Sequence, residues 1–511
     1  MRPTFMGFEI AKSSIFENQK RIDIVGNNLA NASTAGYTRQ RVETAAISPS
    51  AYSTRISSQR VGLAGQGVEA LGVGQVRDEF LDKRFRDEYT KASYHSQVSE
   101  ILQDVQSALG DGKDISDTSG LFGAMANIYT SLNDYCSEPT LETQANIVLS
   151  AFKNITQVLQ QMNSQLDNVA AQHTYDTSIN VDRVNEILQR VAHINQMISQ
   201  DFTVVSDPNN EHFRPNELMD ERNLLLDELS SFADINVTQK SDGTVDVDLG
   251  GKQMVKGIEY NTLLMQKNDD GTIGIRWRET GEDVLFSSGA LKASLDIING
   301  RGANVQSKNE SSAQGIRYYR DKIDSFANAL MEVANSCLPE FDADGKPIPG
   351  KYKTLLGEKQ PDGSVSAKNS ATAANITIST EWQEGGAGYF ICSRAEDMRY
   401  YAQQISHRLT GADTTFKAPG ESFTGTFEEY YNDTLSKLGS DISFHEGRRD
   451  AVSLIADDFQ DRRDDISGVS RDEETANMLM YQKAYEAAAR VMTTLDDLLD
   501  VIVNRMGRVG L

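Results

Sequence analysis

The sequence predicts an α+β multidomain protein with terminal coiled-coil helices from both chain ends, a long-helix bundle domain and inserted β-rich modules. Three observations lead to this fold class. Apolar residues recur every seven positions near both ends, the same spacing returns in the first half of the chain, and a two-residue alternation begins after about residue 235. A seven-residue repeat is typical of helices packed on helices, whereas a two-residue alternation is typical of half-buried strands.

Segment 471–511 carries two apolar rows that share one narrow face of a helix. Each row repeats every seven residues and the two rows are offset by three, which is the spacing of a coiled-coil seam. We therefore expect this segment to pack against another helix. The rows consist of Met478, Tyr485, Met492, Leu499 and Met506, and of Tyr481, Ala488, Leu495 and Ile502.

Segment 5–33 carries a matching pair of rows, so the two chain ends are predicted to meet as paired helices. Both helices are expected to be frayed in the monomer and to fold on assembly; the alternative is a permanent hairpin within one molecule. Asn18 is the polar member of the seam, where an amide can fix the register of a coiled coil. The rows are Phe8, Ile15, Ile22 and Leu29, and Ala11, Asn18, Val25 and Ala32.

An Asn-rich segment, 27–39, is predicted to end the first helix. Asn, Ser and Thr side chains compete for backbone hydrogen bonds and interrupt a helix, and Gly36 can take the left-handed conformation that closes it. We expect the segment to redirect the chain at a subunit contact, with an ordinary helix cap as the alternative. Residues 40–76 are rich in Gly and β-branched residues and are predicted to be extended.

A helical bundle is predicted from the heptad rows that follow. The rows indicate several helices of 20–35 residues, each roughly 30–50 Å long. One row is Val148, Ile155, Met162 and Val169, and the other is Val184, Val191 and Ile198.

Two β-rich modules are predicted from alternating segments and turn residues. Asn236–Thr238, Thr244–Asp248 and Ile273–Trp277 alternate, and Asp242-Gly243 and Asp270-Gly271 give hairpin turns. The second module is rich in Gly, Pro, Thr and Ser, with a strand at Ile376–Ile378.

These patterns divide the chain into nested parts. Segment 1–60 is the N-terminal helix and link, and it pairs with the C-terminal coiled-coil helix 471–511. The bundle, 61–235, is completed by 289–337 and 427–470. The β-rich modules are 236–288 and 338–426.

Composition excludes several classes of function. The net charge of −24 over 511 residues argues against nucleic acid as a partner, because phosphate binding needs a basic surface. The sequence contains no run of about eighteen apolar residues, so it predicts no helix that spans a membrane. The N-terminal segment also lacks the apolar region of a signal peptide, because charged residues interrupt it at Glu9, Lys12 and Glu17.

The chain carries no motif that predicts catalysis, a cofactor or a metal. Its three cysteines form no CxxC pair, and its six histidines have no metal-ligand spacing. Gly65–Ala70 fits a GxGxxG/A pattern but lacks the strand and helix that a nucleotide site needs. We therefore expect a protein that is not an enzyme and needs no cofactor.

Both ends of the chain resemble one protein family. Asn27-Asn28-Leu29-Ala30-Asn31, followed by Thr34, Gly36-Tyr37 and Arg39, resembles the N-terminal signature of bacterial flagellar rod, hook and hook-associated proteins. Asn477-Met478-Leu479-Met480-Tyr481-Gln482-Lys483-Ala484-Tyr485-Glu486-Ala487-Ala488-Ala489-Arg490 resembles the partner signature near their C-terminus. Because both occur in the right order, the chain is identified as a member of this family.

The resemblance implies a structural role in the flagellum. The long helical zone after residue 77 is similar to that of hook-associated proteins at the hook–filament junction, since rod and hook proteins are shorter and mostly β beyond their terminal helices. The implied partners are hook protein, the filament-side hook-associated protein, further copies in a ring, and an export chaperone on the C-terminal helix. The implied location is the extracellular flagellum, reached by type III export without a cleaved signal peptide.

Two other functions stay open from the sequence. One is a hook-type axial protein, and the other is a surface-binding or adhesive protein that acts through its β-rich modules. For the assembly role, the expected interface residues are Phe8, Ile15, Asn18, Ile22, Val25, Leu29, Asn31, Gly36, Tyr37, Met478, Tyr481, Tyr485, Met492, Leu495, Leu499, Ile502 and Met506.

Overall fold

The terminal segments and the bundle form helices where the apolar repeats predict them, except that two predicted helices join into one rod and two further helices form in segment 338–426. The computed structural model describes residues 6–501 except 48–64, 66, 111–119, 202–214, 241, 343–345, 361, 367–370 and 392–393. Its helices are α1 (Met6–Asn31), α3 (Glu79–Leu109), α4 (Gly120–Ser137), α5 (Glu142–Gln200), α7 (Asn216–Phe232), α8 (Ala290–Ile298), α9 (Ile316–Asn335), α10 (Thr380–Phe390), α11 (Ala395–Thr410), α12 (Phe427–Ser467) and α13 (Arg471–Asp500).

The helix α5 is longer than the sequence analysis expected. Its 59 residues carry both heptad rows that suggested separate helices. No Gly or Pro lies between Val169 and Val184, so nothing in the sequence breaks the helix there. At 1.5 Å per residue the rod is about 88 Å long.

The strands form small antiparallel sheets rather than one continuous sheet. Pairing joins β3 to β4, β5 and β6 in one four-stranded sheet, and joins β1 to β2, β7 to β8, β9 to β10, β11 to both β12 and β13, and β14 to β15. The strands are β1 (Gln40–Ala46), β2 (Val68–Gln75), β3 (Ile235–Gln239), β4 (Val245–Leu249), β5 (Lys252–Lys256), β6 (Glu259–Tyr260), β7 (Leu263–Lys267), β8 (Ile273–Trp277), β9 (Pro339–Phe341), β10 (Pro347–Tyr352), β11 (Leu356–Lys359), β12 (Val365–Ser366), β13 (Ile376–Ile378), β14 (Thr414–Ala418) and β15 (Glu421–Gly425).

Both predicted Asp-Gly hairpins are confirmed. β3 pairs with β4 across the turn at Gly243, and β7 pairs with β8 across the turn at Gly271. Both glycines have a left-handed backbone, with φ of 81° and 75°, which only glycine adopts without strain. The turn residues therefore set the register of both hairpins.

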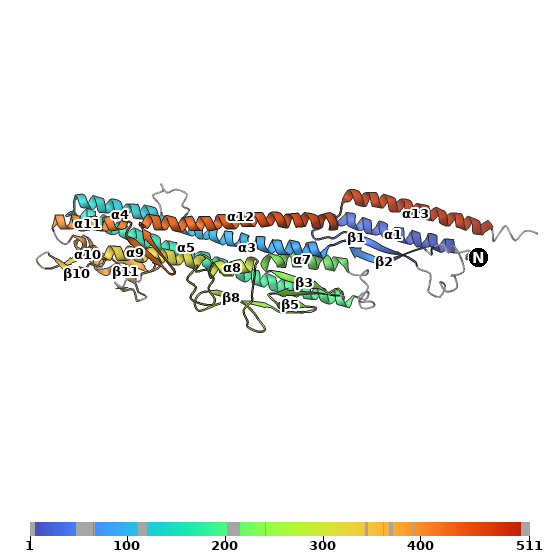
Figure 1. The fold of residues 1–511 in the computed structure, drawn as a ribbon, viewed down its shortest axis with the longest axis horizontal. Helices are drawn as coiled ribbons and strands as arrows, with labels where there is room; N and C mark the ends of the chain where they lie inside the picture. Colours follow the sequence, from blue (N-terminus) through green and yellow to red (C-terminus); the bar gives the residue numbers. More distant parts are fainter. Residues whose placement is uncertain are drawn as a thin grey trace, which may run out of the picture.

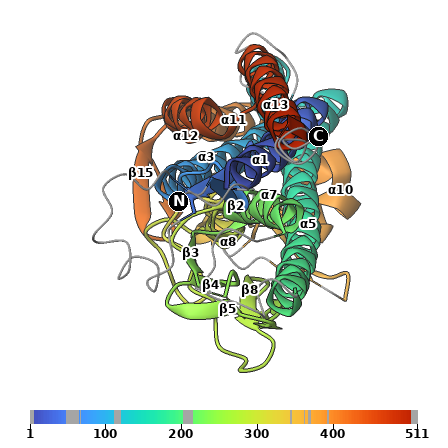
Figure 2. The same ribbon diagram turned by 90° about the vertical axis from the view of Figure 1, so that its right-hand side faces the viewer.

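The molecule is elongated, and both terminal helices lie at one end of it. Figure 1 shows α1 and α13 side by side at one end with β1 and β2, whereas α4, α10 and α11 lie at the other. We call α3, α5 and α12, which run between the two ends, the shaft. Figure 2, which looks along the long axis, shows β3, β4, β5 and β8 on the opposite side from α12 and α13.

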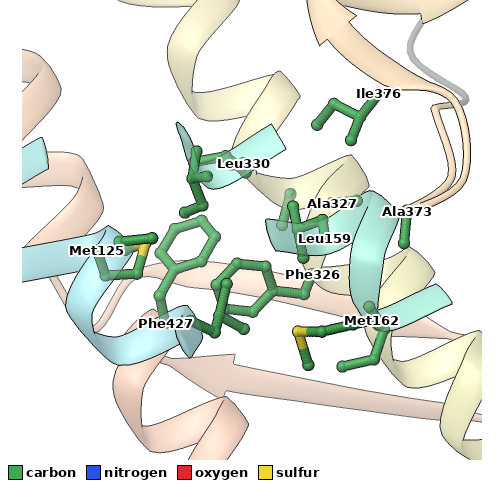
Figure 3. Packing of buried hydrophobic residues seen from close by; sticks show 14 of the residues in the cluster. Met125, Leu159, Met162, Phe326, Ala327, Leu330, Ala373, Ile376 and Phe427 are labelled. Atoms are coloured by element: carbon green, nitrogen blue, oxygen red, sulfur yellow. The ribbon is translucent and has the colours of Figure 1, made fainter. Parts of the chain in front are cut away.

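Two hydrophobic cores form among the residues that the structure describes, and α5 contributes to both. The larger contains the first half of α5, from Ala145 to Leu166, with side chains from α3, α4, α9 and α12. Figure 3 shows its centre, where Phe326 of α9 and Phe427 of α12 lie between Met125 and Leu159. The smaller contains the second half of α5, from Val181 to Ala192, with α7 and the strands β3–β5, β7 and β8.

Segment 338–426 is not wholly β-rich, which corrects its description from composition. It contains α10 and α11, and buried side chains of both belong to the larger core. The sequence did not predict α10, because it contains three glycines, at 385, 386 and 388, and glycine disfavours helices. The fully buried side chain of Trp382 anchors this helix in the core. No helix among the described residues is long and apolar enough to cross a membrane.

Candidate functional site

The paired chain ends form an antiparallel helix pair with a seven-residue register. Asn28 of α1 contacts Glu474 of α13, and Arg21 contacts Tyr481, seven residues earlier on α1 and seven later on α13. Fourteen residues further, Gly7 lies so close to α13 that an added Cβ would be 3.3 Å from Leu495 Cδ1. The spacing of these contacts is that of a coiled coil.

The predicted seam of α13 is the face turned toward α1. Ala488 is buried, and five members are half-buried, whereas Tyr485 is 37% exposed. Ile502 and Met506 lie outside the described residues. The half-buried members are Met478, Tyr481, Met492, Leu495 and Leu499.

On α1 the predicted seam is only partly used. Val25 and Asn18 are buried, but Leu29 is 36% exposed. Phe8, Ile15 and Ile22 are half-buried. The contacts to α13 come from the neighbouring row that contains Gly7, Arg21 and Asn28, because β1 and β2 cover another part of α1. These four apolar residues, Phe8, Ile15, Ile22 and Leu29, form a row along α1 that is only partly covered, and we call it the half-covered row.

Asn18 bonds within its own helix. Its Nδ2 donates to the Ser14 carbonyl at 2.7 Å and reaches the Ser14 hydroxyl at 3.3 Å. The amide nitrogen is therefore satisfied inside α1, and the register role expected for Asn18 stays a prediction.

Asn28 is the best-connected side chain of the terminal helices. It is 1% exposed. Its Nδ2 donates to the Gln40 carbonyl at 2.9 Å and to Glu474 Oε2 at 3.1 Å, and its Oδ1 accepts from the Gln40 amide at 3.0 Å and the Tyr37 hydroxyl at 2.9 Å. These four bonds use the whole capacity of an amide side chain. Asn28 thereby pairs with the Gln40 peptide much as a neighbouring strand would.

Arg39 ties the same region to α13. Its Nε donates to Glu474 Oε1 at 2.8 Å, its Nη1 lies 3.2 Å from Glu473 Oε2, and its backbone amide donates to the Ser467 carbonyl at 2.8 Å. Glu474 is 1% exposed, and its charge is compensated by Arg39 and by the N-terminal turn of α13. We call Asn28, Tyr37, Arg39, Gln40 and Glu474 the joint.

Residues next to the joint contact α7 of the bundle. Asp220 accepts from the Thr38 amide at 3.2 Å and from Gln75 Nε2 at 2.8 Å. Burial raises the pKa of Asp220 above its usual range. Burial, followed by the negative charges of Asp220, Glu217 and Glu474, raises the pKa of Tyr37 to about 12. The Tyr37 hydroxyl therefore keeps its proton and donates it to Asn28.

Gly36 has the left-handed backbone predicted for it, with a φ of 77°. Asn31 closes the end of α1 locally, with its Nδ2 2.8 Å from Asn27 Oδ1 and its Oδ1 accepting from the Thr34 hydroxyl at 3.3 Å. Asn31 and Gly36 therefore shape the turn, while Tyr37 joins the hydrogen-bond network of the joint.

A network of ion pairs connects α3, α7 and α12 near the joint. Arg463 of α12 bridges two carboxylates, with its Nε 3.0 Å from Asp82 and its Nη2 2.7 Å from Asp227. Arg77 lies 2.5 Å from Asp82, and Arg86 lies 2.6 Å from Asp227. Burial by itself would raise the pKa of Asp227, but Arg86 and Arg463 outweigh it and hold that pKa below its ordinary value.

A second apolar row of α13 is exposed, and no other part of the described structure covers it. Met480, Val491, Leu498 and Val501 are 55%, 50%, 59% and 41% exposed. On a helix this row lies roughly 120° from the seam. We call it the outer row. Four large apolar side chains exposed along one helix face are typical of a surface that binds another protein.

Sequence reasoning placed Asn28 and Arg39 in a signature but did not assign their contacts, and it missed Glu474 and Asp220. The signal available for Glu474 was its position in the acidic first turn of a helix, which is common in helices of every function. Its pairing with Arg39 spans 435 residues, so no local pattern indicates it.

Three family models match separate parts of the chain. The model described as the helical domain of flagellar hook-associated protein FlgK matches residues 102–348. The model of flagella basal body rod protein matches residues 10–38, and that of the C-terminal part of the flagellar basal body rod FlgEFG proteins matches residues 465–506. The two rod-protein matches cover most of α1 and α13.

Full-length relatives carry one name. Flagellar hook-associated protein 1 of Bacillus subtilis is 27% identical over 537 residues, with 100% of both chains covered. The protein of that name from Escherichia coli is 22% identical, with 97% of this chain and 98% of the relative covered. The flagellar hook junction protein FlgK from Burkholderia pseudomallei shares the fold, with a TM-score of 0.55 and 12% identity over 74% of this chain and 99% of that chain.

Proposed function

The chain belongs to the family of flagellar hook-associated protein 1, and we propose that it is the structural junction between the hook and the filament of a bacterial flagellum. It acts by polymerising through its terminal helices. The observation that carries the proposal is that the two rod-protein segments, 10–38 and 465–506, come from opposite ends of the chain and fold against each other. This function needs assembly surfaces and no catalytic group.

The shape of the molecule supports one orientation in the assembly. The terminal helices lie at one end of the shaft, and segment 338–426 lies at the other (Figure 1). We propose that α1 and α13 face the axis of the flagellum and that segment 338–426 faces outward. A ring of such subunits would contact hook protein on one side and the filament-side hook-associated protein on the other.

The outer row and the half-covered row of α1 support the proposed contacts between subunits. Within the chain the predicted seam of α13 faces α1, whereas the contacts that α1 makes come from its neighbouring row. The outer row is exposed, and so is Phe16 of α1 at 59%. Neighbouring subunits would cover these side chains, and burial of each large apolar side chain is worth about 1.5–3 kcal/mol.

We also propose that an export chaperone covers the outer row before secretion. An amphipathic helix with an exposed apolar face is suited to a chaperone groove, and Met480 adds a flexible side chain that adapts to more than one partner. The protein would then leave through the flagellar export channel, without a cleaved signal peptide, and stay outside the cell in the flagellum.

Deletion and complementation in the source bacterium test the junction role. Cells that lack the protein should assemble hooks without filaments and should export filament protein into the medium. Loss of the hooks would instead favour a hook-type axial protein, and normal filaments with reduced surface attachment would favour an adhesive role.

A variant of the outer row tests the assembly surface. The triple change Met480→Gln, Val491→Ser, Leu498→Gln should keep the monomer folded, because these side chains are exposed, but should not restore filaments in the deletion strain. The matched control changes exposed polar positions of the same helix, Gln482→Ala and Lys483→Ala, and should restore them. Full complementation by the triple variant would refute the role of the outer row.

A further inference from the structure

Two histidines from different helices face each other in the middle of the shaft. His95 belongs to α3 and His445 to α12, and their Nδ1 atoms are 3.0 Å apart. The ring centroids are 5.1 Å apart and the ring planes are inclined by 50°. Both residues are half-buried. The pair is thus held by packing and still open to water and small ions.

Aromatic neighbours pack against both rings. Tyr94 packs edge-on against His95 at 5.3 Å, and Phe444 packs edge-on against His445 at 5.3 Å. The Tyr94 hydroxyl donates to Asp296 of α8 at 3.1 Å, which anchors that ring. Because packing limits rotation of the side chains, the two imidazoles meet without a large entropic cost.

The separation of the two nitrogens suits a metal ion as well as a hydrogen bond. In the metal-free pair one Nδ1–H donates to the other Nδ1. Neutral imidazole is the commonest metal ligand in proteins. Two metal–nitrogen bonds of about 2.0–2.1 Å at an angle of about 90–110° place the nitrogens roughly 2.9–3.4 Å apart. The observed 3.0 Å lies in this range, so a small rotation of the rings would let both lone pairs converge on one ion.

We propose that His95 and His445 form a binding site for a divalent transition-metal ion that links α3 to α12. The two Nδ1 atoms are the protein ligands. Among the described residues no cluster of three or more His, Cys, Asp or Glu side chains is arranged to hold a metal, so water completes the coordination. The proton that one Nδ1 carries in the metal-free pair moves through solvent to Nε2 of the same ring.

The chemistry of the site selects the ion and limits the affinity. Nitrogen ligands favour Cu²⁺ over Ni²⁺ and Zn²⁺ in the usual order of stability. Arg448 acts electrostatically on His95, and its positive charge opposes a cation. Two ligands beside an arginine give a reversible site, which would stiffen the shaft by preventing α12 from sliding along α3.

Titration of the full-length monomer with CuCl₂ tests the site. Calorimetry should give one Cu²⁺ per chain, electron paramagnetic resonance should show two coordinated nitrogens, and bound Cu²⁺ should raise the melting temperature. His95→Gln or His445→Gln should weaken binding at least 10-fold and remove the two-nitrogen signal. Arg448→Gln should strengthen binding, because it removes the opposing charge.

Exposed single histidines provide the control. His193→Gln and His407→Gln change residues that are exposed on α5 and α11, and both variants should bind Cu²⁺ like the unchanged chain. Absence of binding, or equal loss in His193→Gln, would overturn the proposal. If His95→Gln does not fold, broadening of histidine-labelled NMR signals by Cu²⁺ in the unchanged chain decides. Broadening that spares His95 and His445 also overturns it.

Discussion

Asn28 is the residue on which the joint depends most. Three of its four hydrogen bonds are buried and the one from Tyr37 is partly buried, and the partners come from β1, the preceding turn and α13. A buried polar group without a partner costs about 1–3 kcal/mol. Removing the Asn28 amide leaves several such groups at once, so its effect should exceed that of an ordinary hydrogen bond.

We predict that Asn28→Ala destabilises the pairing of α1 with α13 by about 3 kcal/mol, measured by hydrogen exchange of α1 amides in the full-length protein. The matched control is Asn31→Ala, since the Asn31 hydrogen bonds stay within the turn, and it should cost about 1 kcal/mol. Equal effects of the two changes would contradict the central place of Asn28.

Asp227 gives the ion network a defined dependence on pH. Its pKa in the folded protein lies below the ordinary value of 3.8, so the folded state binds the proton more weakly than the unfolded state. The ionised carboxylate therefore contributes stability above pH 3.8, and this contribution is lost as the pH falls through the lower folded pKa.

We predict that Asp227→Asn lowers stability by about 3 kcal/mol at pH 7, because it leaves Arg86 and Arg463 poorly compensated in a largely buried site. The difference in melting temperature between the variant and the unchanged chain should shrink as the pH is lowered from 5 to 3. A difference that stays constant over that range, measured by calorimetry, would show that the charge of Asp227 is not the cause.

At the scale of single residues, the sequence predicted backbone conformation better than contacts. Gly36 could be assigned a left-handed backbone because it follows a run of helix-interrupting side chains. The role of Asn28 could not be predicted, because one of its partners, Glu474, lies 446 residues away. Only the fold brings that carboxylate to the end of α1.

The link between α12 and α13 depends on one close approach. A Cβ added at Gly468 would lie 2.4 Å from the Asp464 carbonyl oxygen. Its φ of −72° is open to any residue, so space rather than backbone conformation requires glycine here. This link sets the direction in which α13 leaves the shaft.

We predict that Gly468→Ala destabilises the end of α12 by about 1–3 kcal/mol, because backbone must move to admit the methyl group. Gly447→Ala is the matched control in the same helix. Nothing lies within 4 Å of a Cβ at that position, so this change should stabilise the helix by about 0.5–1 kcal/mol. Thermal unfolding of both variants measures the two effects, and a neutral Gly468→Ala would contradict the close approach.

At the scale of elements, periodicity predicted the helices whose apolar face is regular. It identified α1 and α13, and it assigned the segment of α12 to the bundle. It missed α11, although Met398, Ala402, Ile405 and Leu409 form one buried row of that helix, because the surrounding composition suggested strands. It divided α5 because a gap in its apolar row resembled a boundary. The core on both halves of α5 keeps that helix continuous.

In the whole molecule, stability is distributed unevenly along the long axis. α13 buries only Glu474 and Ala488 among its described residues 471–500, whereas α5 contributes to two cores along its length. Segments with few buried apolar contacts open more readily than the core. The chain is therefore a stable shaft with weakly held terminal helices.

We predict that α13 amides exchange with solvent at least about 100-fold faster than α5 amides in the monomer, and that assembly slows them. Hydrogen exchange with mass spectrometry on the monomer and on assembled junctions measures both states. Strong protection of residues 478–500 in the monomer would support a permanent hairpin and contradict completion by neighbours.

The nested order of the segments could be predicted from the sequence. Which segments share a hydrophobic core could not. Matching heptad rows at both ends indicated that the ends meet. No sequence pattern indicated that segment 338–426 shares its core with the bundle, because that depends on where Trp382, Phe390 and their neighbours pack after folding. The assignment of residues to cores is a property of the fold.

The distance in sequence between the two halves of the joint has a consequence for how subunits are made. α1 is synthesised early and α13 late, so the Asn28 amide and the Arg39 guanidinium meet Glu474 only after the bundle and both inserted modules have been translated. A chain that ends before Glu474 leaves both groups without this carboxylate. Only a subunit that contains α13 can therefore form the joint. Incomplete chains would lack the paired terminal helices through which a subunit contacts its neighbours.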